Sequence, residues 1–320
     1  MAGYFANGMT GAPTTVPIGL FAPCSTPRGT RDYVEALGQG AEERGFESVW
    51  VAEHVVGFDR PGRREVLAGE RGTLDPFVLL SFLAAGTSSI RLGTGVTLIS
   101  QRQPLFLAKE TASVDWLSGG RLELGVGLGW ISAEFEALQL RREDRAALAD
   151  RNLELLRTLW TDEVSEYHSR GYDLNACRAY PKPVQGPHPP VHIGGHSDAA
   201  LRRVARYGQG WYGFDLDVDA FCERLSALEL ALAVEGRSRS DVTVSVCPFL
   251  GPVDAGVVAT YAKAGADRVI VFLPAETHDD LFPALDRLQP LTEVANKEGN
   301  VRSVANPAGN DVDGVVSGTT

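Results

Sequence analysis

The sequence predicts one (β/α)8 barrel of the TIM-barrel type, with an insertion between its fourth and fifth strands. Eight short segments rich in β-branched, apolar or aromatic residues alternate along the chain with segments of helical periodicity. The length of 320 residues is common for an α/β barrel that folds as one unit. The alternation breaks only between residues 161 and 190, which we therefore interpret as an insertion.

Apolar runs and capping residues mark the first half of the barrel. Its four predicted strands span residues 16–22, 48–54, 91–100 and 121–130, and its helices span 31–44, 76–89 and 104–116. Thr30 and Asp75 are typical N-caps, Pro104 is suited to a first helical position, and Gly45 is suited to a helix end.

The second half begins with a helix predicted over residues 145–160, followed by the insertion. The insertion contains a predicted hairpin at 167–172 and several prolines between 181 and 190. Four further strands follow at 191–195, 209–214, 242–249 and 268–273, with helices at 196–206, 218–235, 255–264 and 279–288. Residues 1–15 and 291–320 lack periodicity and are predicted flexible extensions, which leaves 16–290 as the barrel domain.

The composition narrows the class of function. A net charge of -11 argues against a nucleic-acid or anionic-membrane partner, because either would require a broad basic surface. The sequence contains no run of eighteen apolar residues, so no membrane span is predicted, and the N-terminus lacks the pattern of a signal peptide. The four cysteines are far apart, which favours neither a metal site nor disulfides and indicates a reducing, cytoplasmic setting.

The segment 121–130, RLELGVGLGW, has the most distinctive pattern in the chain. Glycines at every second position remove side chains from one face of a strand end, so that a ring or phosphate can approach the backbone. A dinucleotide fingerprint is excluded, because Trp130 stands where its third glycine would be needed. The alternative interpretation is a strand crowded by its neighbours inside the barrel.

Other unusual residues also fall at the ends of predicted strands. Glu53 and His54 end the second strand, Gly93 to Thr97 lie in the third, and Gly194 to Ser197 follow the fifth. Ligand sites of such barrels lie at the carboxyl ends of the strands. We therefore expect these residues to converge on one mouth of the barrel.

Several short motifs, in this order and spacing, give the chain a family resemblance over residues 16–290. They are Glu53-His54, LGTGV at 92–96, SGGRL at 118–122, GVGLGW at 125–130, PKPVQ at 181–185, PPV at 189–191 and GGHS at 194–197. With them the chain resembles the luciferase-like monooxygenase family, most closely the branch that depends on the deazaflavin coenzyme F420. The resemblance implies a reduced flavin or deazaflavin bound over the third and fourth strands.

The resemblance also implies positions for cofactor contacts. Similar enzymes have a non-proline cis peptide in the third strand, which matches Gly95-Val96. It implies ring contacts at Thr94, Gly95, Val96, Gly127 and Gly129, and a phosphate site at Gly194, Gly195, His196 and Ser197. Backbone amides and a serine at a helix N-terminus also suit an anion on physical grounds. An ordinary helix N-cap is the alternative for these last four residues.

Three residues are candidates for the chemistry. The position of His54 matches a histidine that, in similar deazaflavin-dependent dehydrogenases, lies beside the reactive ring carbon, where it can exchange a proton. Glu53 points to the opposite face of the strand, so one of the two faces the mouth. Trp130 stands where some deazaflavin dehydrogenases carry a glutamate acid; it can instead stack against a substrate or the ring, or plug the barrel top.

The sequence thus predicts an oxidoreductase that uses coenzyme F420 for hydride transfer to or from a small organic substrate. The alternatives are an FMN-dependent monooxygenase and a non-catalytic flavin-binding protein. A flavin or F420 reductase and a second copy of the chain, in a homodimer, are expected partners. Arg63, Arg64 and Arg102 are candidate contacts for the anionic tail of F420. No metal site is expected, since His192 and His196 lie across a strand end.

Overall fold

The computed structural model describes residues 16–22, 24–25, 29–57, 72–169, 171–249, 251–275 and 277–298. The expected N-terminal extension, residues 1–15, and the two arginines Arg63 and Arg64 lie outside these ranges. Within them, no helix is long and apolar enough to cross a membrane.

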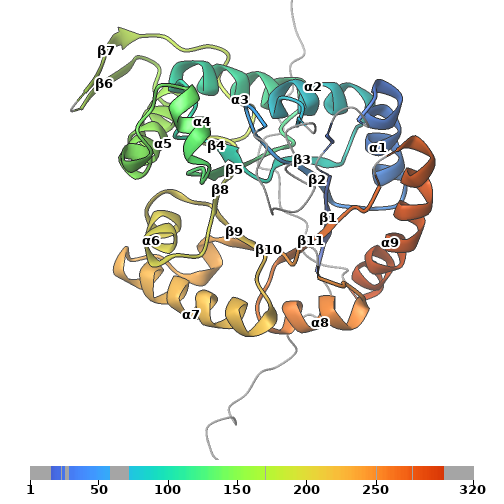
Figure 1. Ribbon diagram of the computed structural model, residues 1–320. Coiled ribbons are helices and arrows are strands. Elements are labelled where there is room, and N and C mark those ends of the chain that lie inside the picture. Colours follow the sequence, from blue (N-terminus) through green and yellow to red (C-terminus); the bar gives the residue numbers. More distant parts are fainter. Residues whose placement is uncertain are drawn as a thin grey trace, which may run out of the picture.

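The strands form a closed parallel barrel with helices around it (Figure 1). The order of neighbouring strands is β3-β2-β1-β11-β10-β9-β8-β5-β4, and pairing of β3 with β5 closes the barrel. The barrel strands are β1 (Ile18–Phe21), β2 (Ser48–Val51), β3 (Arg91–Thr94), β4 (Thr97–Leu98), β5 (Leu122–Gly127), β8 (Val191–Gly194), β9 (Gly210–Phe214), β10 (Thr243–Cys247) and β11 (Arg268–Phe272). Because β3 and β4 are two parts of one strand, the barrel has the eight strands that the sequence predicts.

The helices lie outside the sheet (Figure 1). They are α1 (Arg31–Glu43), α2 (Pro76–Gly86), α3 (Pro104–Ser118), α4 (Ser132–Ala137), α5 (Arg145–Thr161), α6 (Asp198–Tyr207), α7 (Val218–Val234), α8 (Ala255–Lys263) and α9 (His278–Glu298). The predicted caps are present, since the side chains of Thr30 and Asp75 accept hydrogen bonds from the first turns of α1 and α2. Two elements differ from expectation: α4 has no predicted counterpart, and α9 continues past residue 290.

The insertion forms a two-stranded antiparallel hairpin of β6 (Ser165–Ser169) and β7 (Tyr172–Cys177), as the sequence predicts. It extends from the outer edge of the molecule beside α5 (Figure 1). The hydroxyl of Tyr167 donates to Glu154 Oε2 of α5 over 2.9 Å. The hairpin therefore packs on the outside of the barrel wall.

Buried apolar side chains form two separate clusters. The larger one lies between the sheet and the helices, as expected for an α/β barrel. The smaller one consists of buried residues from β1, β2, β9, β10 and β11, namely Phe21, Trp50, Tyr212, Cys247 and Ile270. These five strands are consecutive neighbours in the barrel, in the order β2-β1-β11-β10-β9. The smaller cluster thus fills the barrel interior.

A buried group of charges lies beneath this cluster. Glu123 of β5 contacts His192 Nε2 and Arg91 Nε, and the guanidinium of Arg268 lies 3.7 Å from it. Burial alone would raise the pKa of Glu123, but Arg268 and His192 outweigh it and hold the pKa well below its usual range. These residues are bound to one another, which indicates a structural role at this end of the barrel.

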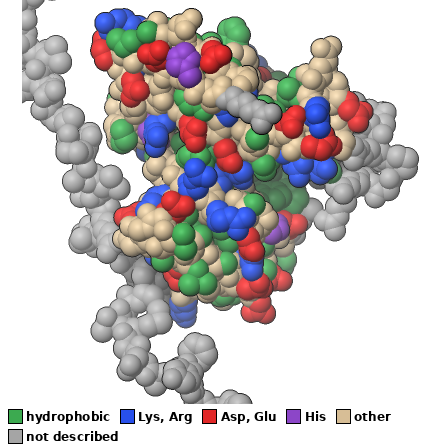
Figure 2. Space-filling view, turned by 90° about the vertical axis from the view of Figure 1, so that its left-hand side faces the viewer, with side chains coloured by type: hydrophobic (Ala, Val, Ile, Leu, Met, Phe, Trp, Pro, Cys, Tyr) green, Lys and Arg blue, Asp and Glu red, His purple; other side chains and the backbone are tan. Residues whose placement is uncertain are grey.

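The outer surface has no dominant charge on the face formed by the hairpin, α5 and α6. Figure 2 shows acidic and basic side chains interspersed there. Arg203 of α6 pairs with Asp150 of α5 over 2.6 Å. This face offers no broad basic area for a polyanion.

Candidate active site

The peptide bond between Gly95 and Val96 is cis, at the position that the resemblance implies. It separates β3 from β4 and places Val96 against two glycines of neighbouring strands. A Cβ on Gly127 would lie 2.6 Å from Val96 Cγ2, and one on Gly194 would lie 3.1 Å from Val96 Cγ1. The missing side chains of Gly127 and Gly194 therefore make room for Val96.

Gly125 makes room in the same way for the backbone. A Cβ at Gly125 would lie 1.9 Å from the carbonyl oxygen of Thr94. The Thr94 hydroxyl is buried and donates to the carbonyl of Gly125 over 2.6 Å. Crowding by neighbouring strands thus explains these glycines directly. The hydroxyl of Thr94, a predicted cofactor contact, is engaged in holding β3 beside β5.

Two polar side chains next to this segment have hydrogen-bonding atoms without partners. Among the described residues, Gln101 Oε1 and Nε2 and Thr97 Oγ1 are buried and make no hydrogen bond. Gln101 Nε2 lies 2.8 Å from the position of a Cβ on Gly129, whose φ is 76°. Buried donors and acceptors are almost always satisfied in folded proteins. The unpartnered atoms of Gln101 and Thr97 therefore fit a ligand ring with polar groups on its edge.

Glu53 is bound entirely within the protein. Its Oε2 accepts from the backbone N–H of Leu98 over 2.7 Å, and its Oε1 accepts from Arg102 Nε over 2.6 Å. Arg102 also binds Asp75 over 2.6 Å and Glu110 over 2.9 Å. Both oxygens of Glu53 are therefore engaged in holding β4 beside the end of β2, which favours a structural role over the predicted catalytic one. Arg102 is likewise occupied by three carboxylates.

His54 follows β2 and is held from two sides. Its ring Nδ1 lies 3.1 Å from Glu134 Oε1, and the same oxygen accepts from the backbone N–H of Val55 over 3.2 Å. The backbone N–H of His54 donates to Thr73 Oγ1 over 3.1 Å. Because an ionised carboxylate can only accept a hydrogen bond, this contact assigns a proton to Nδ1 of His54. The other ring nitrogen, Nε2, makes no contact with Glu134.

Glu134 was not predicted as a site residue. It lies on the short helix α4, is fully buried, and its Oε2 has no partner among the described residues. The available signal was a glutamate between Ile131 and Phe135, both of which are buried here. A charged residue among apolar ones in a short segment after a glycine-rich strand indicates a buried carboxylate that needs a partner.

Trp130 lies beside this pair. Its ring centroid is 6.4 Å from that of His54, with an angle of 87° between the planes. Trp130 retains 39% exposure, so it forms part of the wall at the barrel mouth and does not plug it. The tertiary structure therefore brings together His54, Trp130 and Glu134, from two different strand ends.

The GGHS segment, residues 194–197, leads from the end of β8 to the start of α6. The Ser197 hydroxyl is the N-cap and accepts from the backbone N–H of Ala200 over 3.3 Å. Gly195 has a φ of 103°, which favours glycine, and its carbonyl accepts from Trp211 Nε1 over 2.8 Å. His196 is exposed. The ordinary N-cap is therefore present, and only the remaining backbone N–H groups at this helix start would be available to an anion.

Two arginines near α6 have defined partners. Arg203 is buried and pairs with Asp150, so it does not serve the helix N-terminus. Arg224 of α7 binds Asp198, the first residue of α6, over 3.0 Å. Arg224 therefore lies beside the start of α6. The sequence did not indicate this position.

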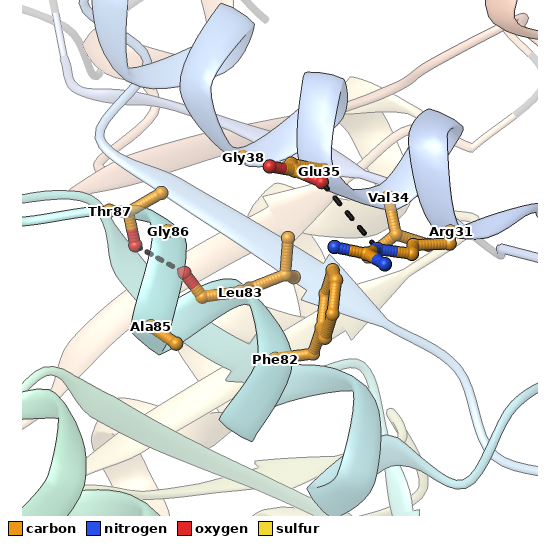
Figure 3. A pocket seen from close by; sticks show the side chains of 9 residues that line it. All are labelled: Arg31, Val34, Glu35, Gly38, Phe82, Leu83, Ala85, Gly86 and Thr87. Atoms are coloured by element: carbon orange, nitrogen blue, oxygen red, sulfur yellow. Dashed lines mark hydrogen bonds and ion pairs between the residues drawn. The ribbon is translucent and has the colours of Figure 1, made fainter.

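A surface pocket of about 180 Å³ lies elsewhere, between α1 and α2 (Figure 3). Its polar groups are already engaged: Arg31 lies 3.9 Å from Glu35, and the Thr87 hydroxyl donates to the carbonyl of Leu83 over 2.7 Å. The pocket is on the outer, helical layer and holds none of the strand-end residues. The candidate active site is therefore the barrel mouth.

A family model described as luciferase-like monooxygenase matches residues 12–303. The chain belongs to the luciferase-like monooxygenase family. This family includes F420- and flavin-dependent oxidoreductases and monooxygenases. An uncharacterized protein of Mycobacterium tuberculosis is 33% identical over 265 residues, which cover 79% of this chain and 91% of that protein.

Two other luciferase-like relatives carry names that include a cofactor. The FMNH2-dependent dimethylsulfone monooxygenase of Pseudomonas putida is 29% identical over 57% of this chain and 48% of its own length. The F420-dependent hydroxymycolic acid dehydrogenase of Mycobacterium tuberculosis is 27% identical over 67% of this chain and 57% of its own. The relatives of this chain therefore include one protein named for FMNH2 and one named for F420.

Solved structures of the luciferase-like family support the fold. An F420-dependent secondary alcohol dehydrogenase in complex with an F420-acetone adduct has a TM-score of 0.72 and 15% identity, over 88% of this chain and all of that one (100%). At this level of identity the likeness concerns the barrel architecture alone.

Proposed function

We propose that this chain is an oxidoreductase that binds coenzyme F420 at the barrel mouth and moves hydride to or from a small organic substrate. The observation that carries the proposal is the His54–Glu134 pair, 3.1 Å apart at the carboxyl ends of the strands and next to Trp130. When bound, F420 supplies a two-electron hydride carrier whose reacting atom is carbon.

The role proposed for His54 is proton transfer. Reduction of a C=C or C=O bond by hydride consumes one proton, and oxidation of an alcohol releases one. A histidine Nε2 at the mouth can give or take that proton. Glu134 holds Nδ1, orients the ring, and offsets the positive charge of the imidazolium when His54 is protonated.

The cofactor is proposed to lie along the glycine-containing half of the mouth. Val96 and Gly129 would support the ring, and the buried polar atoms of Gln101 and Thr97 would meet its polar edge. The segment 194–197 would hold the phosphate with backbone N–H groups at the start of α6. Burial and hydrogen-bonding capacity support this placement.

FMN is the second candidate cofactor, and the 29% identity to an FMNH2-dependent monooxygenase favours it specifically. FMN also carries a phosphate, so the same helix N-terminus suits it. With FMN the activity would be oxygen insertion, and a separate reductase would supply the reduced cofactor.

The cofactor proposal is tested by titrating the protein with F420 and with FMN, each oxidised and reduced, by calorimetry. Tight F420 binding with weak FMN binding is the expected result. Binding of FMN alone would replace the proposal with a monooxygenase. Binding of either cofactor without turnover of any alcohol, enone or imine would favour a non-catalytic carrier.

The proton-transfer proposal is tested with Glu134→Gln and the matched variant Glu136→Gln, whose glutamate is exposed on the same helix. We expect Glu134→Gln to lower kcat by about 10–100-fold with little change in cofactor affinity, as for loss of an orienting carboxylate. Glu136→Gln should leave kcat unchanged. Equal kcat values in the two variants would remove His54 orientation from the mechanism.

We also propose that the protein is a cytoplasmic homodimer. The helix α2 is apolar except for Ser81, and its Val78 and Phe82 remain exposed by 71% and 40%. An apolar helix face exposed to this extent suits a subunit interface. Sedimentation velocity at micromolar concentration measures the mass directly.

A further inference from the structure

Four phenylalanines line the other half of the barrel mouth, opposite the glycines. They end or follow four barrel strands: Phe21 ends β1, Phe214 ends β9, Phe272 ends β11, and Phe249 comes two residues after β10. Because parallel strands point their carboxyl ends the same way, all four lie at the end of the barrel that carries His54. We call these four residues the aromatic wall.

The rings of the aromatic wall form one continuous surface. The centroids of Phe214 and Phe249 are 4.7 Å apart, those of Phe249 and Phe272 are 5.5 Å apart, and Phe21 lies 5.9 Å from both Phe214 and Phe249. Aromatic pairs at these distances contact one another favourably. Below them, Trp50 and Tyr212 are buried and close the barrel interior.

The aromatic wall faces the proposed cofactor half. The strands β1, β11, β10 and β9 are consecutive neighbours in the sheet, whereas the glycines lie on β5 and β8 and the cis bond lies between β3 and β4. Val96, beside the cis bond, packs against the same interior cluster as Phe214, Phe249 and Phe272. A molecule that rests on the wall would therefore be held next to Val96.

Two features distinguish the aromatic wall from ordinary core. Phe214, Phe249 and Phe272 are only partly buried, and they do not belong to the main core between sheet and helices. Phe249 has a φ of 53°, and Asp215, directly after Phe214, has a φ of 54°. This left-handed region is unfavourable for a bulky side chain, and such residues concentrate at functional sites.

The charges around the aromatic wall exclude one class of ligand. The segments 215–217, 248–254 and 273–277, which connect β9, β10 and β11 to their helices, contain no lysine or arginine. Among their described residues, the charged side chains are Asp215, Asp217 and Asp254. A phosphate or carboxylate bound against these three segments would therefore meet like charge, and their sequences offer it no cation.

We propose that the aromatic wall is the substrate-binding half of the site and that it takes an uncharged, apolar substrate with a planar or cyclic carbon framework. This inference rests on the proposed function, because it places the substrate between the wall and the cofactor. It assigns substrate selection to Phe214, Phe249 and Phe272, and it excludes sugar phosphates.

The test measures binding of trans-cinnamaldehyde, a planar uncharged probe, and of glucose 6-phosphate, by calorimetry. The protein is saturated with oxidised F420, which cannot reduce the aldehyde, and the titrations are repeated without cofactor. We expect cinnamaldehyde to bind and glucose 6-phosphate not to bind. Phe249→Ala should weaken cinnamaldehyde binding by about tenfold or more, the scale of one lost aromatic contact with its buried area.

Two further variants keep the test interpretable. Phe249→Leu retains an apolar side chain of similar bulk and should weaken binding by about two- to fivefold while the fold is kept. Phe282→Ala removes a partly exposed phenylalanine on α9 and should change nothing. The affinity for F420 should be the same in all three variants and the unaltered protein.

The outcomes separate the two proposals. If F420 binds but cinnamaldehyde does not, or if Phe249→Ala and Phe282→Ala bind it equally, the aromatic wall is not the substrate site and the proposed function stands. If F420 does not bind but cinnamaldehyde binding to the cofactor-free protein depends on Phe249, the cofactor assignment fails and the wall remains. Stronger binding of glucose 6-phosphate than of cinnamaldehyde would overturn the inference.

Discussion

Replacement of Gly125 by alanine tests the packing that shapes the barrel mouth. The added Cβ would lie 1.9 Å from the carbonyl oxygen of Thr94, whereas ordinary contacts of a Cβ begin at 3.4 Å. The two strands must therefore separate by roughly 1.5 Å, the difference of these distances. The obstructing atom belongs to the backbone, so no rotation of a side chain can relieve the clash.

The expected cost is about 3 kcal/mol, at the upper end of the range for overpacking a well-packed core. For a chain of 320 residues, with an unfolding entropy of about 2.1 cal/mol/K per residue, that corresponds to a fall in Tm of roughly 4–5 °C. Gly127→Ala should cost less, about 1 kcal/mol, because its Cβ would meet Val96 Cγ2 at 2.6 Å and that side chain can turn. This variant should weaken cofactor binding, because Val96 is proposed to support the ring, and it should lower Tm only slightly.

Gly86→Ala is the control, since a Cβ there would have no atom within 4 Å and the residue ends α2. It should be neutral or stabilise the protein by up to about 1 kcal/mol. The assay is thermal unfolding followed by circular dichroism, with F420 and FMN titrations on each variant. A Gly125→Ala protein that melts with the unaltered chain and binds cofactor equally well would refute the packing that we describe.

Two further predictions concern charged residues. Arg102→Met leaves the buried carboxylate of Glu53 without its cation and should lower the free energy of unfolding in urea by about 3–5 kcal/mol. The control Arg202→Met, at an exposed position, should change it almost not at all. Equal losses in the two variants would contradict the role of Arg102. Burial raises the pKa of Glu42, but backbone N–H groups of Ser89 and Ile90 outweigh it and lower the pKa from 4.5 to about 2. Since the pKa of Glu42 is depressed in the folded state, its contribution to the free energy of unfolding is present above about pH 4.5 and is lost as the pH falls towards 2. Glu42→Gln should therefore cost about 1–2 kcal/mol at pH 7 and nothing near pH 2. A stability difference that does not depend on pH would contradict this.

The sequence was sufficient for the elements and for the end of the barrel at which the candidate site lies. Strands and helices follow from local features, namely apolar runs, the caps at Thr30 and Asp75, and the glycines at helix ends. The alternation of elements led to the barrel, and the barrel led to the strand ends as the place of the site. His54 and Trp130 were found in this way, and they do lie together.

The tertiary structure decided what each side chain at the mouth contacts. The pairing of His54 with Glu134 joins residues 80 positions apart, and Glu53 and Arg102 are 49 apart. The sequence showed that Glu53 and His54 point to opposite faces of a strand, but it did not determine which of them is bound by an arginine.

The aromatic wall illustrates the same limit over the whole chain. Phe21 and Phe272 stand near opposite ends of the sequence and meet only because β1 pairs with β11 to close the barrel. Periodicity records which residues are apolar within one element, whereas strand register and closure determine which elements meet. The sequence by itself therefore determined the barrel and the end of it that carries the candidate site. Only the closed structure decided which residues lie together as the His54–Glu134 pair, the proposed cofactor half and the aromatic wall.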